Sequence, residues 1–169
     1  MRRSLLQSEA GVAVLEFAIL APIFFLLLLA LIDMSLFFAT HSIVDKSVEN
    51  AARAVRLGSL QADKDGSNFR ATLCQNLYFV ECEKFSFSVE ATDNLTSVSS
   101  KPKIDKEGQI DNPTYNPGKP EQFVVITIVY VYRFIIPWIG ELLGDDGLSD
   151  PQTRAIVSFL VIKNEPYPD

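Results

Sequence analysis

The sequence predicts an α+β protein in which a long N-terminal membrane-spanning helix packs on a small antiparallel β-sheet. Three observations support this class: an apolar run near the N-terminus, an amphipathic helical pattern directly after it, and three β-rich stretches further along the chain. The 169 residues combine 48% hydrophobic side chains with a net charge of −6, a pairing that is unusual for one small soluble domain. The acidic balance argues against nucleic acid as a partner, because phosphate binding needs concentrated Lys and Arg.

The apolar run is long enough to cross a membrane. Residues 17–32 are uninterrupted, and counted from Val12 the segment has 21 residues, which rise about 31 Å at roughly 1.5 Å each. Asp33 ends the run, although residues 34–39 are apolar again. A buried core helix is disfavoured because so small a domain could not surround it. A cleaved secretory signal peptide is the nearer alternative, but its apolar region is usually shorter and ends at a small-residue site.

The residues around this run also predict its topology. Arg2 and Arg3 place the N-terminus in the cytoplasm by the positive-inside rule, so the rest of the chain is expected outside. We therefore expect three parts: a leader over residues 1–11, a transmembrane helix over 12–40 and an outer α+β domain over 41–169.

An amphipathic pattern extends the first helix beyond the membrane. Its apolar members recur at helical spacing on one face, with charged residues on the other: Val44, Val48, Ala51, Ala52 and Val55. Gly58 is suited to end the helix, because glycine adopts the left-handed conformation of many helix ends. The first helix is therefore expected to run from near Val12 to Leu57 and to pack its apolar stripe on a sheet.

The middle of the chain predicts a short helix, a strand and a long loop. Phe69, Leu73 and Leu77 are four residues apart and favour a second helix. Residues 85–91 alternate apolar with polar side chains, which is typical of a half-buried strand. Residues 93–121 hold four of the nine prolines and are expected to form a mobile, exposed loop.

The last third predicts the rest of the sheet. Residues 122–136 are β-branched and aromatic on both faces, which favours a central strand. This stretch is too short and too β-rich for a second membrane helix, and Pro137 is expected to end it. Residues 138–143 predict a helical turn, and residues 153–163 predict the third strand.

Cys74 and Cys82 are the only cysteines. Outside the cytoplasm an even pair predicts a disulfide, which would join the second helix to the first strand; two buried free thiols are the alternative. The sequence has no nucleophile–base set, P-loop or glycine-rich dinucleotide turn. Asp145, Asp146 and Asp150 lack the spacing of an EF-hand, so we expect an acidic surface turn, with no metal site and no cofactor.

Two residues of the membrane segment are candidates for function. Glu16 is the one charged side chain between Val12 and Ile32. A carboxylate near the start of a membrane helix is costly, so it is a functional candidate by default, the alternative being that it snorkels to the headgroups. Pro22 removes a backbone hydrogen bond and is expected to kink or locally melt the helix, either passively or to help extract the helix from the bilayer.

The residues around Glu16 form a processing motif. A polar, basic-tipped leader is followed by Gly11, four residues, Glu16, the aromatic Phe17 and an apolar helix. This order resembles the class III signal of prepilins, which a membrane prepilin peptidase cuts after the glycine. The resemblance implies cleavage between Gly11 and Val12, which makes Glu16 the fifth residue of the mature chain. The amine released at Val12 could then pair with Glu16 of a neighbouring subunit, so that two buried charges neutralise each other.

A longer stretch resembles one pilin family. Residues 11–22, GVAVLEFAILAP, resemble the start of the TadE family, minor pilins (pseudopilins) of the tight-adherence (Tad/Flp) pilus, which is type IV-like. Residues 51–58 are similar to that family's helix end. Residues 163–167, KNEPY, resemble its closing Arg-Asn-Glu-Pro, with Lys in place of Arg. The resemblance covers residues 1 to about 58 and the last dozen residues, and it implies a pilin-like fold.

The resemblance also implies a function, partners and a location. The chain is expected to help assemble the tight-adherence pilus, as a protease substrate and not as an enzyme. Its partners would be the major pilin, sister TadE- or TadF-like minor pilins, the prepilin peptidase and the inner-membrane pilus platform. It would sit in the bacterial inner membrane with a periplasmic C-terminal domain, and enter the pilus base or tip. The alternatives are a type II secretion pseudopilin and an uncleaved, membrane-anchored periplasmic binding or sensor domain.

Overall fold

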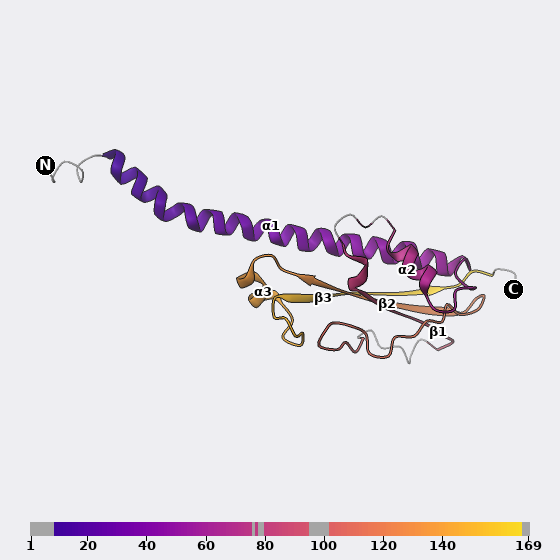
Figure 1. Cartoon of the computed structure of the whole chain (residues 1–169). Helices are drawn as coiled ribbons and strands as arrows, with labels where there is room; N and C mark the ends of the chain where they lie inside the picture. Colours follow the sequence, from indigo (N-terminus) through magenta and orange to yellow (C-terminus); the bar gives the residue numbers. More distant parts are fainter. Residues whose placement is uncertain (1–8, 76, 78–79, 95–101, 167–169) are drawn as a thin grey trace.

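A long helix and a three-stranded antiparallel sheet form the frame of the protein (Figure 1). The computed structural model describes residues 9–75, 77, 80–94 and 102–166. The C-terminal half of helix α1 (Glu9–Arg56) lies along one face of the sheet, and its N-terminal half projects beyond the sheet (Figure 1). The α+β class is therefore confirmed. Arg2, Arg3 and the closing Tyr167 lie outside the described residues.

Helix α1 buries the face that the amphipathic pattern predicted. Val44, Val48 and Val55 are almost completely buried against the sheet. The helix ends at Arg56, because Gly58 turns the chain with a positive φ of 75°. There the amides of Gly58 and Ser59 donate to carbonyls of the last helical turn, at 3.0 and 3.1 Å. This pair of hydrogen bonds is a Schellman motif, so the expected glycine stop is confirmed.

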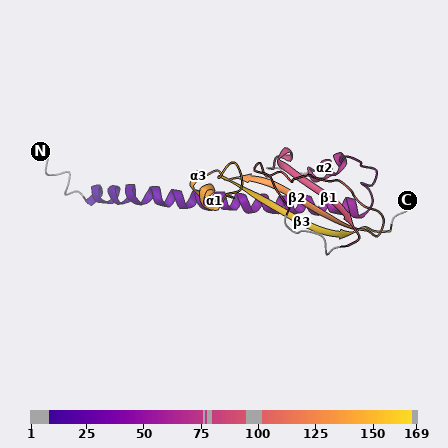
Figure 2. The same ribbon diagram turned by 90° about the horizontal axis from the view of Figure 1, so that it is seen from below.

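The sheet has the order β1-β2-β3 and is antiparallel throughout. Its strands are β1 (Phe85–Thr92), β2 (Phe123–Arg133) and β3 (Thr153–Lys163), and they cross the C-terminal half of α1 obliquely (Figure 2). Strand β2 is central and buried on both faces, as its β-branched composition predicted. Its residues on the side of α1 form the core together with the helix: Val124, Ile126, Ile128, Tyr130 and Tyr132.

A loop covers the face of the sheet opposite α1. Ser86 and Ser88, expected on an exposed face of β1, are buried, because their hydroxyls accept hydrogen bonds from the amides of Ile110 (2.9 Å) and Thr114 (3.1 Å). Tyr115 extends this contact through a parallel bridge to β1. About half of the described part of the loop, residues 102–121, is exposed as expected, but Gly108 and Ile110 are buried where the loop meets the sheet. The short serine side chains let the loop backbone approach the sheet and satisfy its amides.

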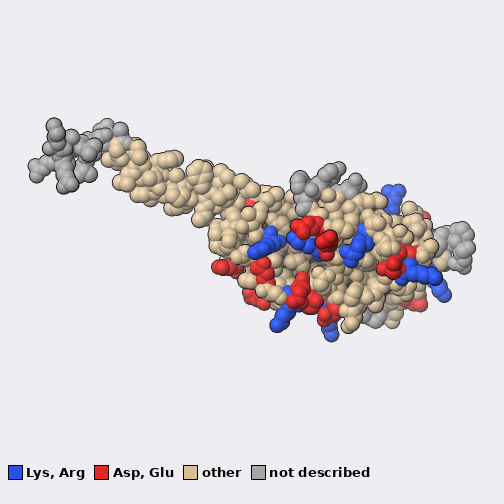
Figure 3. Space-filling view, viewed as in Figure 1, with Lys and Arg blue, Asp and Glu red and all other residues tan. Residues whose placement is uncertain are grey.

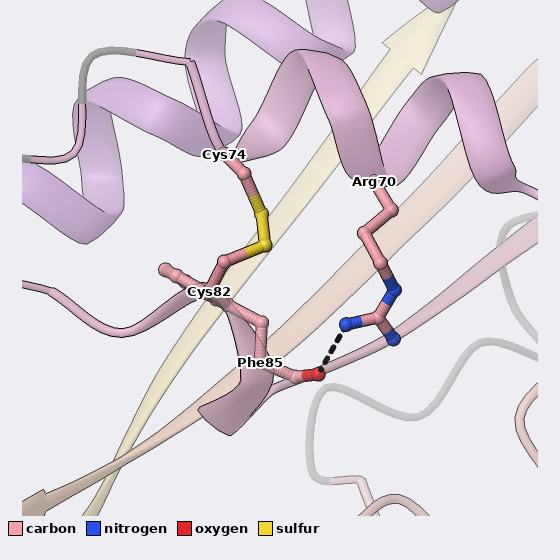
Figure 4. Close-up of a disulfide and its surroundings, with 4 residues drawn as sticks. All are labelled: Arg70, Cys74, Cys82 and Phe85. Carbon is pink, nitrogen blue, oxygen red and sulfur yellow. Dashed lines mark hydrogen bonds between the residues drawn. A yellow bond between two sulfur atoms is a disulfide. The ribbon is translucent and has the colours of Figure 1, made fainter.

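A disulfide joins helix α2 (Ser67–Leu73) to the start of β1 (Figure 4). Cys74 follows the helix directly, and Cys82 begins the short 3-10 helix η1 (Cys82–Lys84) that leads into the strand. The predicted pairing is thus confirmed, with 5.5 Å between the two Cα atoms. Arg70 adds a second link, because its Nη1 donates to the carbonyl of Phe85 at 3.4 Å (Figure 4).

The two helices outside α1 differ slightly from expectation. Phe69 and Leu73 are buried as predicted, but Leu77 lies beyond the end of α2, because the chain leaves the helix at the disulfide. Helix α3 (Pro137–Leu143) is the expected helical turn, with its proline in the first turn, where no amide hydrogen is needed. Gly140 of α3 faces the Gln152 backbone so closely that a Cβ would clash at 2.7 Å.

Removing the disulfide should destabilise the sheet domain. The Cys74→Ser/Cys82→Ser double variant is expected to lose about 2–3 kcal/mol of unfolding free energy, because so short a cross-linked loop restricts the unfolded chain by that amount. Denaturant unfolding of the full chain in detergent measures this. Reduction of the parent protein should give the same loss and serves as the control. A double variant as stable as the oxidised parent would contradict the prediction.

Candidate functional site

The predicted site lies on the part of α1 that projects beyond the sheet, residues 11–32. Large apolar side chains on all sides of this projecting segment are exposed, from Val12 to Ile32. Within the described residues, α1 is the one helix long and apolar enough to cross a membrane. Lys, Arg, Asp and Glu side chains gather over the sheet end of the molecule, while almost none lie along the projecting segment (Figure 3). The composition of the whole chain is thus the average of an apolar projecting segment and a charged domain.

The processing motif lies at the tip of the projecting segment. Gly11, Val12, Glu16 and Phe17 are helical and exposed, and none is packed against the sheet domain. Gly11 lies in the first turn of α1, where amides lack intrahelical partners and glycine weakens the helix, so unwinding of this end costs little. Val12 and Glu16 are four residues apart and share one face of the helix. The structure contains no partner that tests cleavage or pairing, so both stay predictions.

Pro22 lies inside α1, and the helix continues on both sides of it. Proline deprives the carbonyl one turn earlier of its partner, which leaves a weak point in the hydrogen-bond ladder. In lipid such a point is tolerated where neighbouring helices or local adjustments satisfy the backbone. The kink that the sequence predicts at Pro22 stays a prediction.

A buried carboxylate joins the projecting segment to the sheet. Asp33 is only 1% exposed. Its carboxylate accepts hydrogen bonds from the Tyr132 hydroxyl (3.2 Å) and from the amides of Ile135 (3.1 Å) and Ile136 (3.0 Å). We call this set of contacts the Asp33 junction. It ties the residue that ends the apolar run to the end of β2. The expected domain boundary at residue 41 stays a prediction.

Aromatic rings surround the Asp33 junction and shield it from water. The Phe37 ring stacks on Phe134 with 5.5 Å between ring centroids, and both rings meet Tyr132 edge-on at 5.3 and 5.2 Å. Burial raises the pKa of the Tyr132 phenol, and the negative charge of Asp33 raises it further. The phenol therefore keeps its proton and remains a donor to Asp33 over the whole physiological pH range.

The closing motif of the sequence holds the opposite end of α1. Asn164 is buried, and its Nδ2 donates to the carbonyls of Pro117 (2.9 Å) and Lys119 (3.0 Å). The amide of Glu165 donates to the carbonyl of Arg56 at 3.0 Å, and its carboxylate pairs with the Arg56 guanidinium at 3.1 Å. The Asn-Glu pair thus connects the end of β3 with the loop before β2 and with the end of α1.

The remaining polar candidates have structural roles. His41 pairs with Asp45 one helical turn away at 3.0 Å, and both side chains are nearly half exposed. In the acidic turn, Asp145 and Asp150 accept hydrogen bonds from backbone amides, Asp145 from that of Ala155 (2.8 Å) and Asp150 from that of Gln152 (2.9 Å). Among the described residues, no three His, Cys, Asp or Glu side chains are grouped so that they could hold a metal ion.

These features define a protein in which one helix, long and apolar enough to cross a membrane, carries a small antiparallel sheet domain. Residues 11–53 match the family model of the TadE-like proteins. The resemblance drawn from the N-terminal motif is therefore confirmed over nearly the whole of α1, and it is consistent with a TadE-like pilin of the Tad pilus. The matched range ends before the sheet. Comparisons of the chain with curated proteins and with solved structures gave no match.

Sequence reasoning missed the Asp33 junction. It treated Asp33 only as the end of the apolar run, although apolar residues resume directly after it. That resumption was the available signal, because a lone carboxylate inside a continuing apolar stretch needs partners wherever it is buried. The partners could not be named, since Tyr132 lies 99 positions further along the chain.

Loss of the Asp33 carboxylate should destabilise the domain more than any nearby surface charge. Asp33→Asn removes the negative charge and replaces one acceptor oxygen with an NH2 group, so the buried donors lose a charged acceptor and we expect a loss of about 2–4 kcal/mol of unfolding free energy. Denaturant unfolding of the full chain in detergent measures it. Asp45→Asn is the matched control, because the same change at a half-exposed position should cost less than about 0.5 kcal/mol. Equal stabilities of the two variants would refute the role assigned to Asp33.

Proposed function

We propose that this protein is a minor pilin or pseudopilin that helps assemble the tight-adherence pilus. The observation that carries the proposal is the projecting segment of α1, whose large apolar side chains are exposed on all sides and which lies within the range that matches the TadE-like family. Such a surface needs lipid or other apolar helices around it. A pilin uses both in turn, first the bilayer and then the helices of its neighbours in the filament.

The proposed path begins with insertion and cleavage. The chain inserts with its N-terminus in the cytoplasm and its sheet domain in the periplasm, anchored by residues 12–32. The prepilin peptidase then cuts between Gly11 and Val12. The position of this bond in the first turn of α1 favours the cut, because the helix end can unwind without disturbing the sheet domain.

Helix packing would complete the assembly. The amine released at Val12 is a buried positive charge once the helix enters a bundle, and Glu16 of an adjacent subunit supplies the opposite charge. Partners are the major pilin, sister TadE- or TadF-like minor pilins, the prepilin peptidase and the inner-membrane platform. The role is structural, and the protein acts as a peptidase substrate located in the inner membrane and at the pilus base or tip. The family match favours this machine over a type II secretion system.

The mature N-terminus tests the cleavage step. When the full chain is expressed with its prepilin peptidase, N-terminal sequencing should find Val12 first. Gly11→Val should abolish cleavage, because a β-branched side chain at the scissile position blocks close approach of the backbone. Gly147→Val is the control, since no atom lies within 4 Å of the position of its added Cβ. Retention of Met1 on a chain that still supports pilus assembly would rule the proposal out.

The charge of Glu16 tests the assembly step separately. Glu16→Gln should leave cleavage intact but lower recovery in sheared pili by roughly tenfold or more, because an unpaired amine in an apolar bundle costs at least one to a few kcal/mol. The ratio of this chain in the pilus and membrane fractions measures the effect. Glu49→Gln removes a carboxylate from the exposed face of the same helix and should change nothing. Normal recovery of the Glu16→Gln chain would exclude the proposed pairing.

A further inference from the structure

A small apolar patch is exposed on helix α3 and on the short connection that leads from β2 into it. Ile135 is 68% exposed, Trp138 42% and Leu142 73%. Trp138 and Leu142 lie one turn apart on the outward face of α3, while Ile139 and Gly140 on the opposite face are buried in the domain. These three exposed side chains, the α3 patch, have no role in the core of the sheet domain.

The Asp33 junction fixes the α3 patch at one height along α1. Asp33 accepts hydrogen bonds from the amides of Ile135 and Ile136, so the chain that enters α3 lies beside Asp33. Both views place α3 at the end of the sheet nearest the projecting segment (Figures 1 and 2). Since Asp33 directly follows the apolar residues 12–32, whose length of about 31 Å matches a hydrocarbon core, the patch lies level with one membrane surface.

We propose that the α3 patch inserts into the boundary between headgroups and acyl chains of the phospholipid bilayer. This proposal rests on the membrane anchoring of α1 proposed above. Tryptophan favours this boundary, because its ring is apolar and its N–H needs a polar partner. Exposed charges of both signs lie beside α3, Glu141 within the helix and Arg154, whose Nη1 donates to the carbonyl of Leu143 at 3.0 Å, so the surface does not require anionic lipid. The sheet domain would then touch the membrane at two points, through α1 and through α3, which orients it before assembly.

A second protein chain is a less suitable partner for the α3 patch than the membrane. A stable protein interface buries about 800 Å² on each partner, and three side chains cannot supply that area. The membrane needs no such area, because α1 already holds the patch at the surface and the insertion of a few side chains only sets the tilt of the domain.

Trp138 is the only tryptophan of the chain, so its fluorescence reports on the patch directly. The full chain is reconstituted at low density in phosphatidylcholine vesicles that carry a nitroxide either just below the headgroup or near the end of the acyl chain. We expect Trp138 to be quenched, and at least roughly twofold more strongly by the shallow label than by the deep one, as for a side chain at the interface. Emission that neither label quenches would overturn the proposal.

Two further variants, each with a single tryptophan in a Trp138→Phe background, test the membrane anchoring of α1 separately from the α3 proposal. The Phe24→Trp chain carries its probe in the projecting segment and should be quenched most by the deep label. The Leu57→Trp chain carries it about 36 Å from Asp33 along α1 and should escape both labels. If the probe at position 24 also escapes, membrane anchoring itself fails. If that probe is quenched and Trp138 is not, only the α3 proposal fails, and a dependence of Trp138 emission on protein density would assign the patch to a second copy.

Discussion

The position of the sheet domain on helix α1 depends on the buried carboxylate of Asp33. A carboxylate without water is stable only where donors surround it, and here a phenol and two backbone amides fill that role. These donors come from the end of β2 and the turn into α3. The same residue that terminates the apolar run therefore determines where the sheet begins, and an error of one helical turn would leave both the carboxylate and the amides unpaired.

Helix α1 performs two tasks that have opposite surface requirements. Its first half is apolar on every side and suits lipid or neighbouring helices, whereas its second half is amphipathic and suits a sheet. The family match covers residues 11–53 and thus includes both halves but not the strands. The likeness to the family thus lies in the helix, and the strands lie outside the matched range.

Local pattern predicted most of the fold. The helical spacing of Val44, Val48 and Val55 predicted a helix with one buried face, and the β-branched composition of β2 predicted a central strand. A loop over residues 93–121 was predicted, but its packing on the sheet was not, since that contact depends on the hydroxyls of Ser86 and Ser88. Polar residues that form hydrogen bonds with backbone groups far along the chain produce no periodic pattern in the sequence. The contacts of Asp33 were missed for the same reason. The motif of Gly11 and Glu16 could be predicted because its spacing is local, and its role stays a prediction.

The sheet-packed half of α1 is held at both ends, by the Asp33 junction next to the projecting segment and by the Arg56–Glu165 pair at the far end. A force applied along the helix axis therefore acts in shear. The contacts of Val44, Val48 and Val55 with the sheet must then break together and not one after another. Such an attachment resists a pull on the projecting segment far better than a helix that could peel away from its tip, and it transmits the force from that segment to the whole domain.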